Sequence, residues 1–322
     1  MSTIPTTLES GAARYTVVGA PRGKACPDSL PVSVLLLHRG SRLYRAEALR
    51  ELERLGFESI VSVEVGGGEG SDLESLAARH PLARFLLLSE PASPGAMLNL
   101  GMRESCGPYV FALWSDMSLQ AQALSSRFFE RVAEQDLLCQ APFLSDKAGE
   151  LLPTAAAPAL NKSSLKVLGL APARDGARSL YPFDYCGIYS RERFVMLGGC
   201  DVGIANPYWQ KLDFGFRAWL WGEEIKLASA LKMAYDEALP DEDSTPDEGY
   251  RRFWLKNLAP SFHGDSGQIA LSRFWSYLRG PGQGLFPAAA EFRAAREWVR
   301  VNRFRFRNDA PSLVDLWDEG GS

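Results

Sequence analysis

The sequence lacks a large excess of charge of either sign, and it lacks paired cysteines. Its 35 Lys and Arg residues against 39 Asp and Glu give a formal net charge of −4, which argues against a surface for duplex nucleic acid. The five cysteines are widely spaced with no Cys-x-x-Cys pair, as is typical of free thiols in a reducing compartment. With 322 residues and 46% hydrophobic content, the chain is neither wholly disordered nor a disulfide-stapled miniprotein.

Long apolar runs and a signal-peptide pattern are also missing. Val32–Leu37 and Phe85–Leu88 have the length of strands, well short of the ~20 residues that cross a membrane. The first residues do not show the basic stretch followed by an apolar one that marks a signal peptide. We therefore expect a cytoplasmic protein.

Glycines cluster at Gly66–Gly70, but this cluster has neither of the common nucleotide-binding patterns. No Gly-Lys-Ser/Thr follows it, as a P-loop requires, and Ser71 stands where a Gly-x-Gly-x-x-Gly pattern needs its third glycine. A nucleoside triphosphatase and a standard dinucleotide site are therefore disfavoured.

From residue 31 onward the sequence contains a regular alternation of apolar and amphipathic segments. Leu43–Gly56, Asp72–Arg79 and the stretch that begins at Pro94 have apolar residues at helical spacing. Around them lie four predicted strands, Val32–Leu37, Ser59–Val63, Phe85–Leu88 and Tyr109–Leu113. Strands that alternate with helices predict an α/β fold, an open and mostly parallel sheet with helices on both faces.

The pattern is less regular after residue 116. We expect a helix at Ala121–Glu134, loops over the sheet at Ala141–Pro172, and mainly helices at Tyr250–Asp318. The run Asp236–Glu248 contains seven acidic residues and is interpreted as a solvated loop or a domain boundary. The predicted domains are a leader, a main α/β domain and a C-terminal helical extension, at residues 1–30, 31–240 and 241–322.

Polar residues follow three of the predicted strands, at the edge where parallel sheets bind ligands. His38 and Arg39 come after the first strand, Glu64 after the second, and Ser115 and Asp116 after the fourth. A carboxylate at a strand end is rarely a core residue, so Asp116 is the strongest candidate for a ligand-binding role. The alternatives are a helix cap for Asp116, an exposed loop carboxylate for Glu64 and a solvated strand end for His38 and Arg39.

Five motifs follow one another in order between about residues 30 and 235. They are the first strand and helix, the second strand with its glycines, the segment Arg84–Asp116, the segment Cys186–Asp201 and the segment Leu212–Gly222. Together these resemble family 2 glycosyltransferases, which have the GT-A fold, a Rossmann-like α/β architecture. The resemblance implies transfer of a sugar from a nucleotide-sugar donor to a hydroxyl group, with inversion, in the synthesis of a polysaccharide, glycolipid or cell-envelope glycan. It implies a glycan or lipid-linked acceptor.

The resemblance also implies roles for individual residues. Glu64 would contact the base or ribose, and Asp116 would bind a divalent metal, Mn or Mg, that offsets the charge of the leaving diphosphate. The acceptor's proton would go to a carboxylate near the Asp-x-x-x-Arg pattern, where Asp213 is the nearest candidate. The implied donor residues are His38, Arg39, Glu64, Asn99, Ser115 and Asp116; the acceptor residues are Tyr208, Trp209 and Arg217; and the metal ligands are Asp116 and His263.

A structural role is the alternative for several of these residues. Asp213 and Arg217 have the i, i+4 spacing of an ion pair within a helix. Asn99 is equally explained as a satisfied polar residue of a helix, and Tyr208 and Trp209 as core aromatics.

Two departures from the family pattern keep other functions open. Trp114 stands where the family has the first acid of its Asp-x-Asp, and Gln210-Lys211 where it has Glu-Asp. A non-catalytic module that binds a nucleotide or a partner is therefore the alternative to an enzyme. A nucleotidylyltransferase is a weaker third hypothesis, because Gly40-Ser41-Arg42 is a poor match to the loop it needs.

The C-terminal extension is rich in Arg, Trp and Phe between Phe274 and Phe306. We expect it to pack on the main domain or to form a homodimer. Contact with a membrane surface is the alternative.

Overall fold

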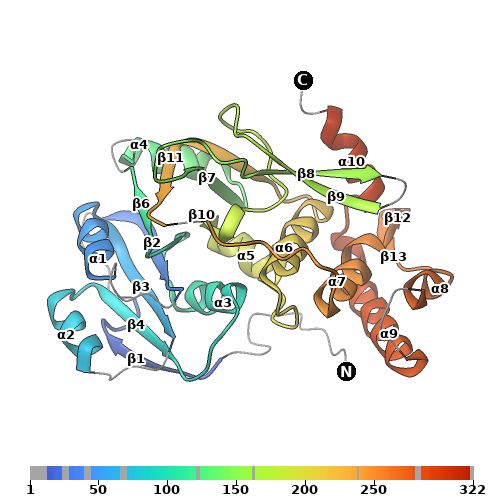
Figure 1. Cartoon of the computed structure of the whole chain (residues 1–322), viewed down its shortest axis with the longest axis horizontal. Helices are drawn as coiled ribbons and strands as arrows, with labels where there is room; N and C mark the ends of the chain where they lie inside the picture. The colour runs from blue at the N-terminus through green and yellow to red at the C-terminus, as the bar shows by residue number, and fades with distance from the viewer. Residues whose placement is uncertain are drawn as a thin grey trace.

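A nine-stranded sheet forms the centre of the computed structural model, which describes residues 13–23, 29–39, 45–65, 71–120, 124–161, 164–237, 239–279 and 284–319 (Figure 1). The strand order is β1-β4-β3-β2-β5-β10-β7-β11-β6. Its strands are β1 (Tyr15–Gly19), β2 (Leu30–Leu37), β3 (Phe57–Val65), β4 (Ala83–Leu88), β5 (Tyr109–Trp114), β6 (Met117–Leu119), β7 (Cys139–Ser145), β10 (Gly187–Ser190) and β11 (Ile225–Tyr235).

The four predicted strands are confirmed as β2, β3, β4 and β5, and they pair in parallel. Their apolar runs are buried because both faces of the sheet are covered. On one face Leu35 packs against Gly101 of α3 (Pro94–Glu104), so closely that a Cβ at Gly101 would lie 2.2 Å from the Leu35 side chain. On the other face Phe111 contacts Phe57, which in turn contacts Phe129 of α4 (Ser126–Gln135). Helices α1 (Arg45–Arg54) and α2 (Ser71–Arg79) complete this half of the fold.

The prediction of loops at residues 141–172 is wrong. Cys139–Ser145 forms β7, an entirely buried strand between β10 and β11. Ala155–Asn161 and Ser164–Leu170 form the hairpin β8–β9, a separate two-stranded sheet. Alanine and proline are depleted in strands in general, so local composition concealed a hairpin that is stabilised by the burial of its small side chains.

The C-terminal part is mainly helical, as predicted, but a short hairpin interrupts it. Its helices are α7 (Glu248–Phe253), η3 (Trp254–Leu258), α8 (Arg273–Leu278), α9 (Leu285–Asn302) and α10 (Ala310–Glu319), and its hairpin is β12 (Ser261–His263) with β13 (Ser266–Gln268). These helices pack on the main α/β part through tryptophans: Trp298 stacks on Trp221, and Trp317 meets Trp219 edge-on. Within the described ranges no helix combines the length and the apolar character needed to cross a bilayer.

Candidate functional site

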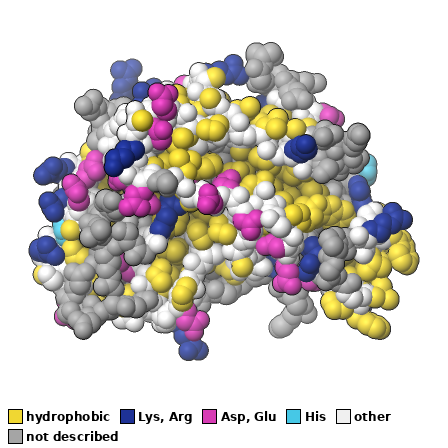
Figure 2. Space-filling model, in the orientation of Figure 1, with side chains coloured by type: hydrophobic (Ala, Val, Ile, Leu, Met, Phe, Trp, Pro, Cys, Tyr) yellow, Lys and Arg dark blue, Asp and Glu magenta, His cyan; other side chains and the backbone are white. Residues whose placement is uncertain are grey.

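A cleft of about 490 Å³ opens at the carboxyl ends of β2 and β5. It is bordered by the turn η2 (Phe183–Tyr185), the start of α6 (Pro207–Leu220) and the segment Pro240–Asp243. The chain that links β11 to α7 crosses the middle of the molecule in Figure 1, and Asp and Glu side chains gather along the middle of the same face in Figure 2. The cleft therefore lies at the sheet edge that the sequence predicts, beneath an acidic segment.

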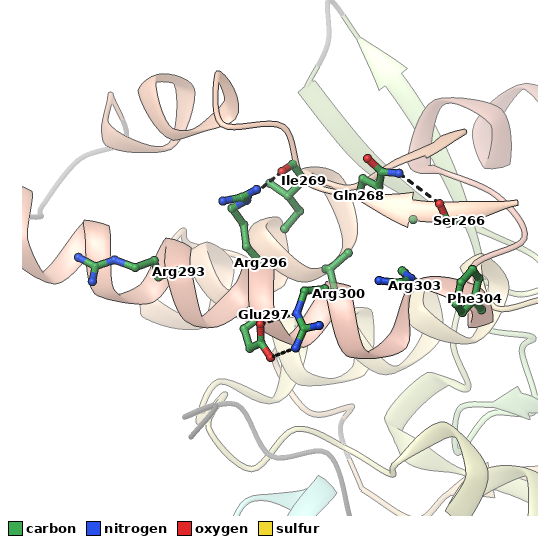
Figure 3. Close-up of a pocket in the computed structure, with 11 residues that line it drawn as sticks. Ser266, Gln268, Ile269, Arg293, Arg296, Glu297, Arg300, Arg303 and Phe304 are labelled. Carbon is green, nitrogen blue, oxygen red and sulfur yellow. Dashed lines mark hydrogen bonds and ion pairs between the residues drawn. The ribbon is translucent and has the colours of Figure 1, made fainter. Parts of the chain in front are cut away.

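A second cavity, of about 620 Å³, lies between β13 and α9 in the C-terminal part (Figure 3). None of the predicted donor, acceptor or metal residues lines it. The cleft at the sheet edge is therefore the candidate site for the chemistry.

Arg39 is the central cation of the cleft. Its Nε donates to Asp116 Oδ2 at 2.9 Å, its Nη1 donates to Asp184 Oδ1 at 3.2 Å, and its Nη2 donates to the other Asp184 oxygen. The guanidinium carbon lies 4.1 Å from the centre of the Trp114 ring, a cation–π contact. Burial alone would lower the pKa of Arg39, but the Asp184 and Asp116 carboxylates outweigh it and raise that pKa above its usual value.

Asp184 occupies a left-handed turn that brings its carboxylate to Arg39. The φ angles are 52° at Asp184 and 61° at Tyr185, unfavourable values for residues with a Cβ. Three contacts hold the turn: Trp114 Nε1 donates to the Asp184 carbonyl at 2.8 Å, Tyr235 Oη donates to Asp184 Oδ2 at 2.9 Å, and Tyr189 Oη donates to the Tyr185 carbonyl at 2.8 Å. Trp114 thus contacts both Arg39 and the turn that carries Asp184. Sequence reasoning missed Asp184 because it belongs to none of the motifs.

Lys211 is the second cation of the cleft, and it is also paired. Its ammonium contacts Glu242 of the acidic segment and lies 5.2 Å from the centre of the Phe183 ring. Two more hydrogen bonds of 3.0 Å hold this segment: Asn206 Nδ2, at the residue that caps α6, donates to the Asp243 carbonyl, and Trp209 Nε1 of α6 donates to the Thr245 carbonyl. The run Asp236–Glu248 is therefore more than a solvated loop, because part of it covers the cleft.

His38 and Glu64 come together at the inner end of the site. Ser62 Oγ lies 2.8 Å from His38 Nε2 and 2.9 Å from Glu64 Oε1, so the three side chains form a buried chain. Only His38 of the three lines the cleft. The ends of β2 and β3 therefore bring these two side chains into contact.

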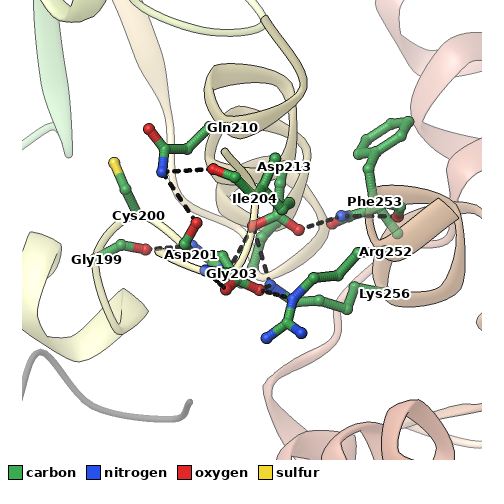
Figure 4. A network of polar contacts seen from close by, with 12 residues as sticks. Gly199, Cys200, Asp201, Gly203, Ile204, Gln210, Asp213, Arg252, Phe253 and Lys256 are labelled. Atoms are coloured by element: carbon green, nitrogen blue, oxygen red, sulfur yellow. Dashed lines mark hydrogen bonds and ion pairs between the residues drawn. The ribbon is translucent and has the colours of Figure 1, made fainter. Parts of the chain in front are cut away.

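Asp213 lies away from the cleft, in a buried network behind it (Figure 4). Its carboxylate has no exposed surface and accepts from Arg217 Nη1 at 2.9 Å, Lys256 Nζ at 3.0 Å and Asn257 Nδ2 at 2.8 Å. Asp201 shares Lys256 at 2.8 Å. Burial raises the pKa of Asp201, but Lys256 and Arg252 outweigh it and hold this pKa well below its usual range.

The geometry of this network matches the ion-pair interpretation of Asp213 and Arg217. Both carboxylate oxygens of Asp213 are buried and hydrogen-bonded, so neither is accessible to an acceptor substrate. Neither residue borders the cleft. Gln210, which stands where the family has an acid, is likewise a connector: it accepts from the Gly95 amide at 2.9 Å and donates to the carbonyls of Asp201 and Ile204 at 3.0 Å.

The remaining predicted residues are divided between the cleft and the core. Tyr208 lines the cleft, whereas Trp209 is buried against Tyr250 and Phe253. Asn99 exchanges two hydrogen bonds of 2.8 Å with the backbone of Cys200, which is the role of a satisfied polar residue of a helix. Ser115 lines a neighbouring depression of about 340 Å³.

The residues around Asp116 do not fit a divalent metal. Asp116 Oδ2 is bound to Arg39, and Trp114 replaces the other expected carboxylate. His263 belongs to β12, which is well separated in Figure 1 from β6, the strand that directly follows Asp116 in the chain. In the part of the chain that the structure describes, no three His, Cys, Asp or Glu side chains are grouped closely enough to hold a metal ion. The Arg39 guanidinium lies between Asp116 and Asp184 instead.

Comparison with known structures identifies the fold. A crystal structure of GalNAc-T7 with UDP, GalNAc and Mn²⁺ superposes with a TM-score of 0.55 at 14% identity, over 86% of this chain and 58% of that one. TarS residues 1–349 from S. aureus, in complex with UDP-GlcNAc, gives 0.46 at 14% identity over 84% and 72% of the chains. The mannosyltransferase PcManGT from Pyrobaculum calidifontis, with GDP-Man and Mn²⁺, gives 0.45 at 14% identity over 94% and 79%.

The similarity to GalNAc-T7 establishes a GT-A-like glycosyltransferase fold, and it confirms the predicted α/β class with a mostly parallel sheet. Neither protein-family models nor curated protein sequences match the chain. Membership of family 2 stays a prediction.

Proposed function

We propose that the protein is a glycosyltransferase that binds a nucleotide-sugar in the cleft and transfers the sugar, with inversion, to a hydroxyl group of a glycan or lipid-linked acceptor. One observation carries the proposal: on a GT-A-like fold, a cation is fixed between two carboxylates at the strand ends where ligands bind. The free cysteines among the described residues support a cytoplasmic location.

The donor's diphosphate is bound by the two cleft cations in this proposal. Arg39 uses three of the five N–H groups of a guanidinium on Asp116 and Asp184, which leaves two for phosphate oxygens. Lys211 binds a phosphate of the donor when that phosphate displaces Glu242 from the Lys211 ammonium group. His38, which follows β2 and lines the cleft, would contact the base or ribose, and Glu64 of β3 would hold His38 through Ser62.

Charge stabilisation of the leaving diphosphate comes from Arg39 and not from a metal. A divalent ion is implied by the resemblance, and the GalNAc-T7 and PcManGT structures contain Mn²⁺. Here Asp116 Oδ2 and both Asp184 oxygens bind the Arg39 guanidinium, whereas the buried Asp116 Oδ1 has no hydrogen-bond partner among the described residues. The guanidinium is permanently charged and forms paired hydrogen bonds with phosphate.

Inverting transfer needs a carboxylate on the acceptor side of the donor. Asp213 is enclosed, so we assign this role to Glu242, whose carboxylate lies in the cleft beside Tyr208 and Lys211. Displacement from Lys211 by the diphosphate would free this carboxylate to accept the proton of the acceptor hydroxyl.

Calorimetry against UDP-, GDP- and dTDP-sugars, in EDTA and in Mn²⁺, tests the donor site. Binding of one donor, followed by detection of sugar transfer or slow donor hydrolysis, is the expected result. Failure to bind any of the three in either buffer would refute the proposal. Binding without transfer or hydrolysis would favour the non-catalytic module.

A further inference from the structure

A row of four arginines, here called the α9 arginine row, borders the 620 Å³ cavity (Figure 3). Arg293, Arg296 and Arg300 belong to α9, and Arg303 begins the short helix η4 (Arg303–Arg305) that continues it. Their spacing of three, four and three residues places them within about 80° of one another around the helix axis. Arg296 donates to the Ile269 carbonyl and Arg300 is paired with Glu297. No carboxylate of the described residues forms an ion pair with Arg293 or Arg303.

This row belongs to a segment whose charge is opposite to that of the whole chain. Residues 269–307 contain eight arginines and two glutamates, a formal charge of +6, whereas the protein carries −4. Both glutamates have partners, Arg300 for Glu297 and the Tyr277 hydroxyl for Glu291. The positive charge is therefore concentrated on one part of the surface.

Large apolar side chains of the same segment, residues 269–307, are also exposed. Phe286 is 86% exposed, Leu271 68%, Phe304 65%, Trp275 64% and Leu285 54%. At about 100° per residue, Leu285 and Phe286 lie on the same side of α9 as the arginine row. The opposite side of the helix is buried. In Figure 2, yellow apolar side chains project at the edge of the molecule where Figure 1 shows α8 and α9.

We propose that this face, the α9 arginine row with the exposed apolar residues around it, docks on an anionic phospholipid membrane. Arginines reach lipid phosphates while Trp, Phe and Leu side chains enter the interfacial region, the arrangement of an interfacial amphipathic helix. A symmetric contact between two copies would bring the two arginine rows together, which repulsion opposes. Nucleic acid would account for the arginines and leave the exposed apolar side chains unused. The proposal does not depend on the donor site.

Co-sedimentation of the full chain with lipid vesicles tests this docking. Vesicles of phosphatidylcholine alone are compared with vesicles that contain about one-third phosphatidylglycerol. The wild-type protein should bind the anionic vesicles, less at high salt, and bind the neutral ones weakly. The variant Arg293→Gln/Arg303→Gln should bind anionic vesicles about 30-fold more weakly. Phe286→Ser should weaken binding further at high salt, where the charge contribution is screened.

A matched control is available on α4, where Arg127 and Arg131 are exposed and four residues apart. Arg127→Gln/Arg131→Gln removes the same charge and should bind as wild type does. Equal wild-type binding to neutral and anionic vesicles, or none to either, would overturn the proposal whatever the variants do. So would a dimer in light scattering that Phe286→Ser dissociates, or an oligonucleotide complex that the α9 variant loses while vesicle binding is unchanged.

Discussion

Replacing Arg39 by Gln should weaken donor binding and create a dependence on metal. Gln keeps much of the length of the side chain but removes the charge and the N–H groups that remain for phosphate. Loss of one or two charge-assisted hydrogen bonds corresponds to about 2–3 kcal/mol, so the donor Kd should rise about 30- to 160-fold. The two acids that Arg39 bridges, Asp116 and Asp184, would then lack their internal cation.

Calorimetry with the nucleotide-sugar, in EDTA and again in Mn²⁺, measures both effects. For the wild type, the Kd should be the same in the two buffers. For Arg39→Gln, Mn²⁺ should recover part of the lost affinity, because two carboxylates can then share the metal. Arg50→Gln on the outer helix α1 is the matched control and should bind as the wild type does. Wild-type binding that disappears in EDTA would show that a metal, and not Arg39, supplies the charge, and the reasoning would be refuted.

Three further predictions concern carboxylates. Glu242→Gln should tighten nucleotide binding, because Lys211 is released, and should abolish turnover; a variant that keeps turnover would remove Glu242 as the base. Asp213→Asn should lower the free energy of unfolding by about 3 kcal/mol in urea and leave the donor Kd of the folded protein unchanged, because it leaves buried cations short of a partner. The folded-state pKa of Asp201 is lowered, so its stabilising contribution is complete above its unfolded pKa of about 4 and is lost as the pH falls further. The difference in unfolding free energy between wild type and Asp201→Asn should therefore shrink in acid, and a difference that grows would contradict this sign.

The central strands were predictable because their burial leaves a direct mark on the sequence. A strand covered on both faces, such as Val32–Leu37, must be apolar at nearly every position. The positions of His38, Arg39 and Asp116 followed from the same rule, since they come where those strands end. The β8–β9 hairpin has no such mark, because small alanines at its buried positions resemble the composition of a loop.

The cleft itself was less predictable because its key contacts join distant parts of the chain. Arg39 and Asp184 are 145 residues apart, and the turn that brings them together depends on hydrogen bonds from Trp114 and Tyr235.

The role of Asp213 was hard to predict although its partner Arg217 is close in the sequence. Its spacing from Arg217 is the same for a catalytic carboxylate and for a structural ion pair, and only the position of Lys256 and Asn257 on η3 distinguishes them.

The two departures from the family pattern have different physical consequences, and this bears on whether the site is degenerate. Gln210 connects backbone groups of α3 and of the loop before α6, so it replaces an acid with a purely structural amide. Trp114 removes a carboxylate, but its ring stacks on Arg39 and its indole N–H holds the turn that presents Asp184. The loss of a metal ligand alone would not account for a cation fixed between Asp116 and Asp184. In the mechanism that we propose, Arg39 supplies the positive charge that the leaving diphosphate needs, and this favours an active transferase over a binding module.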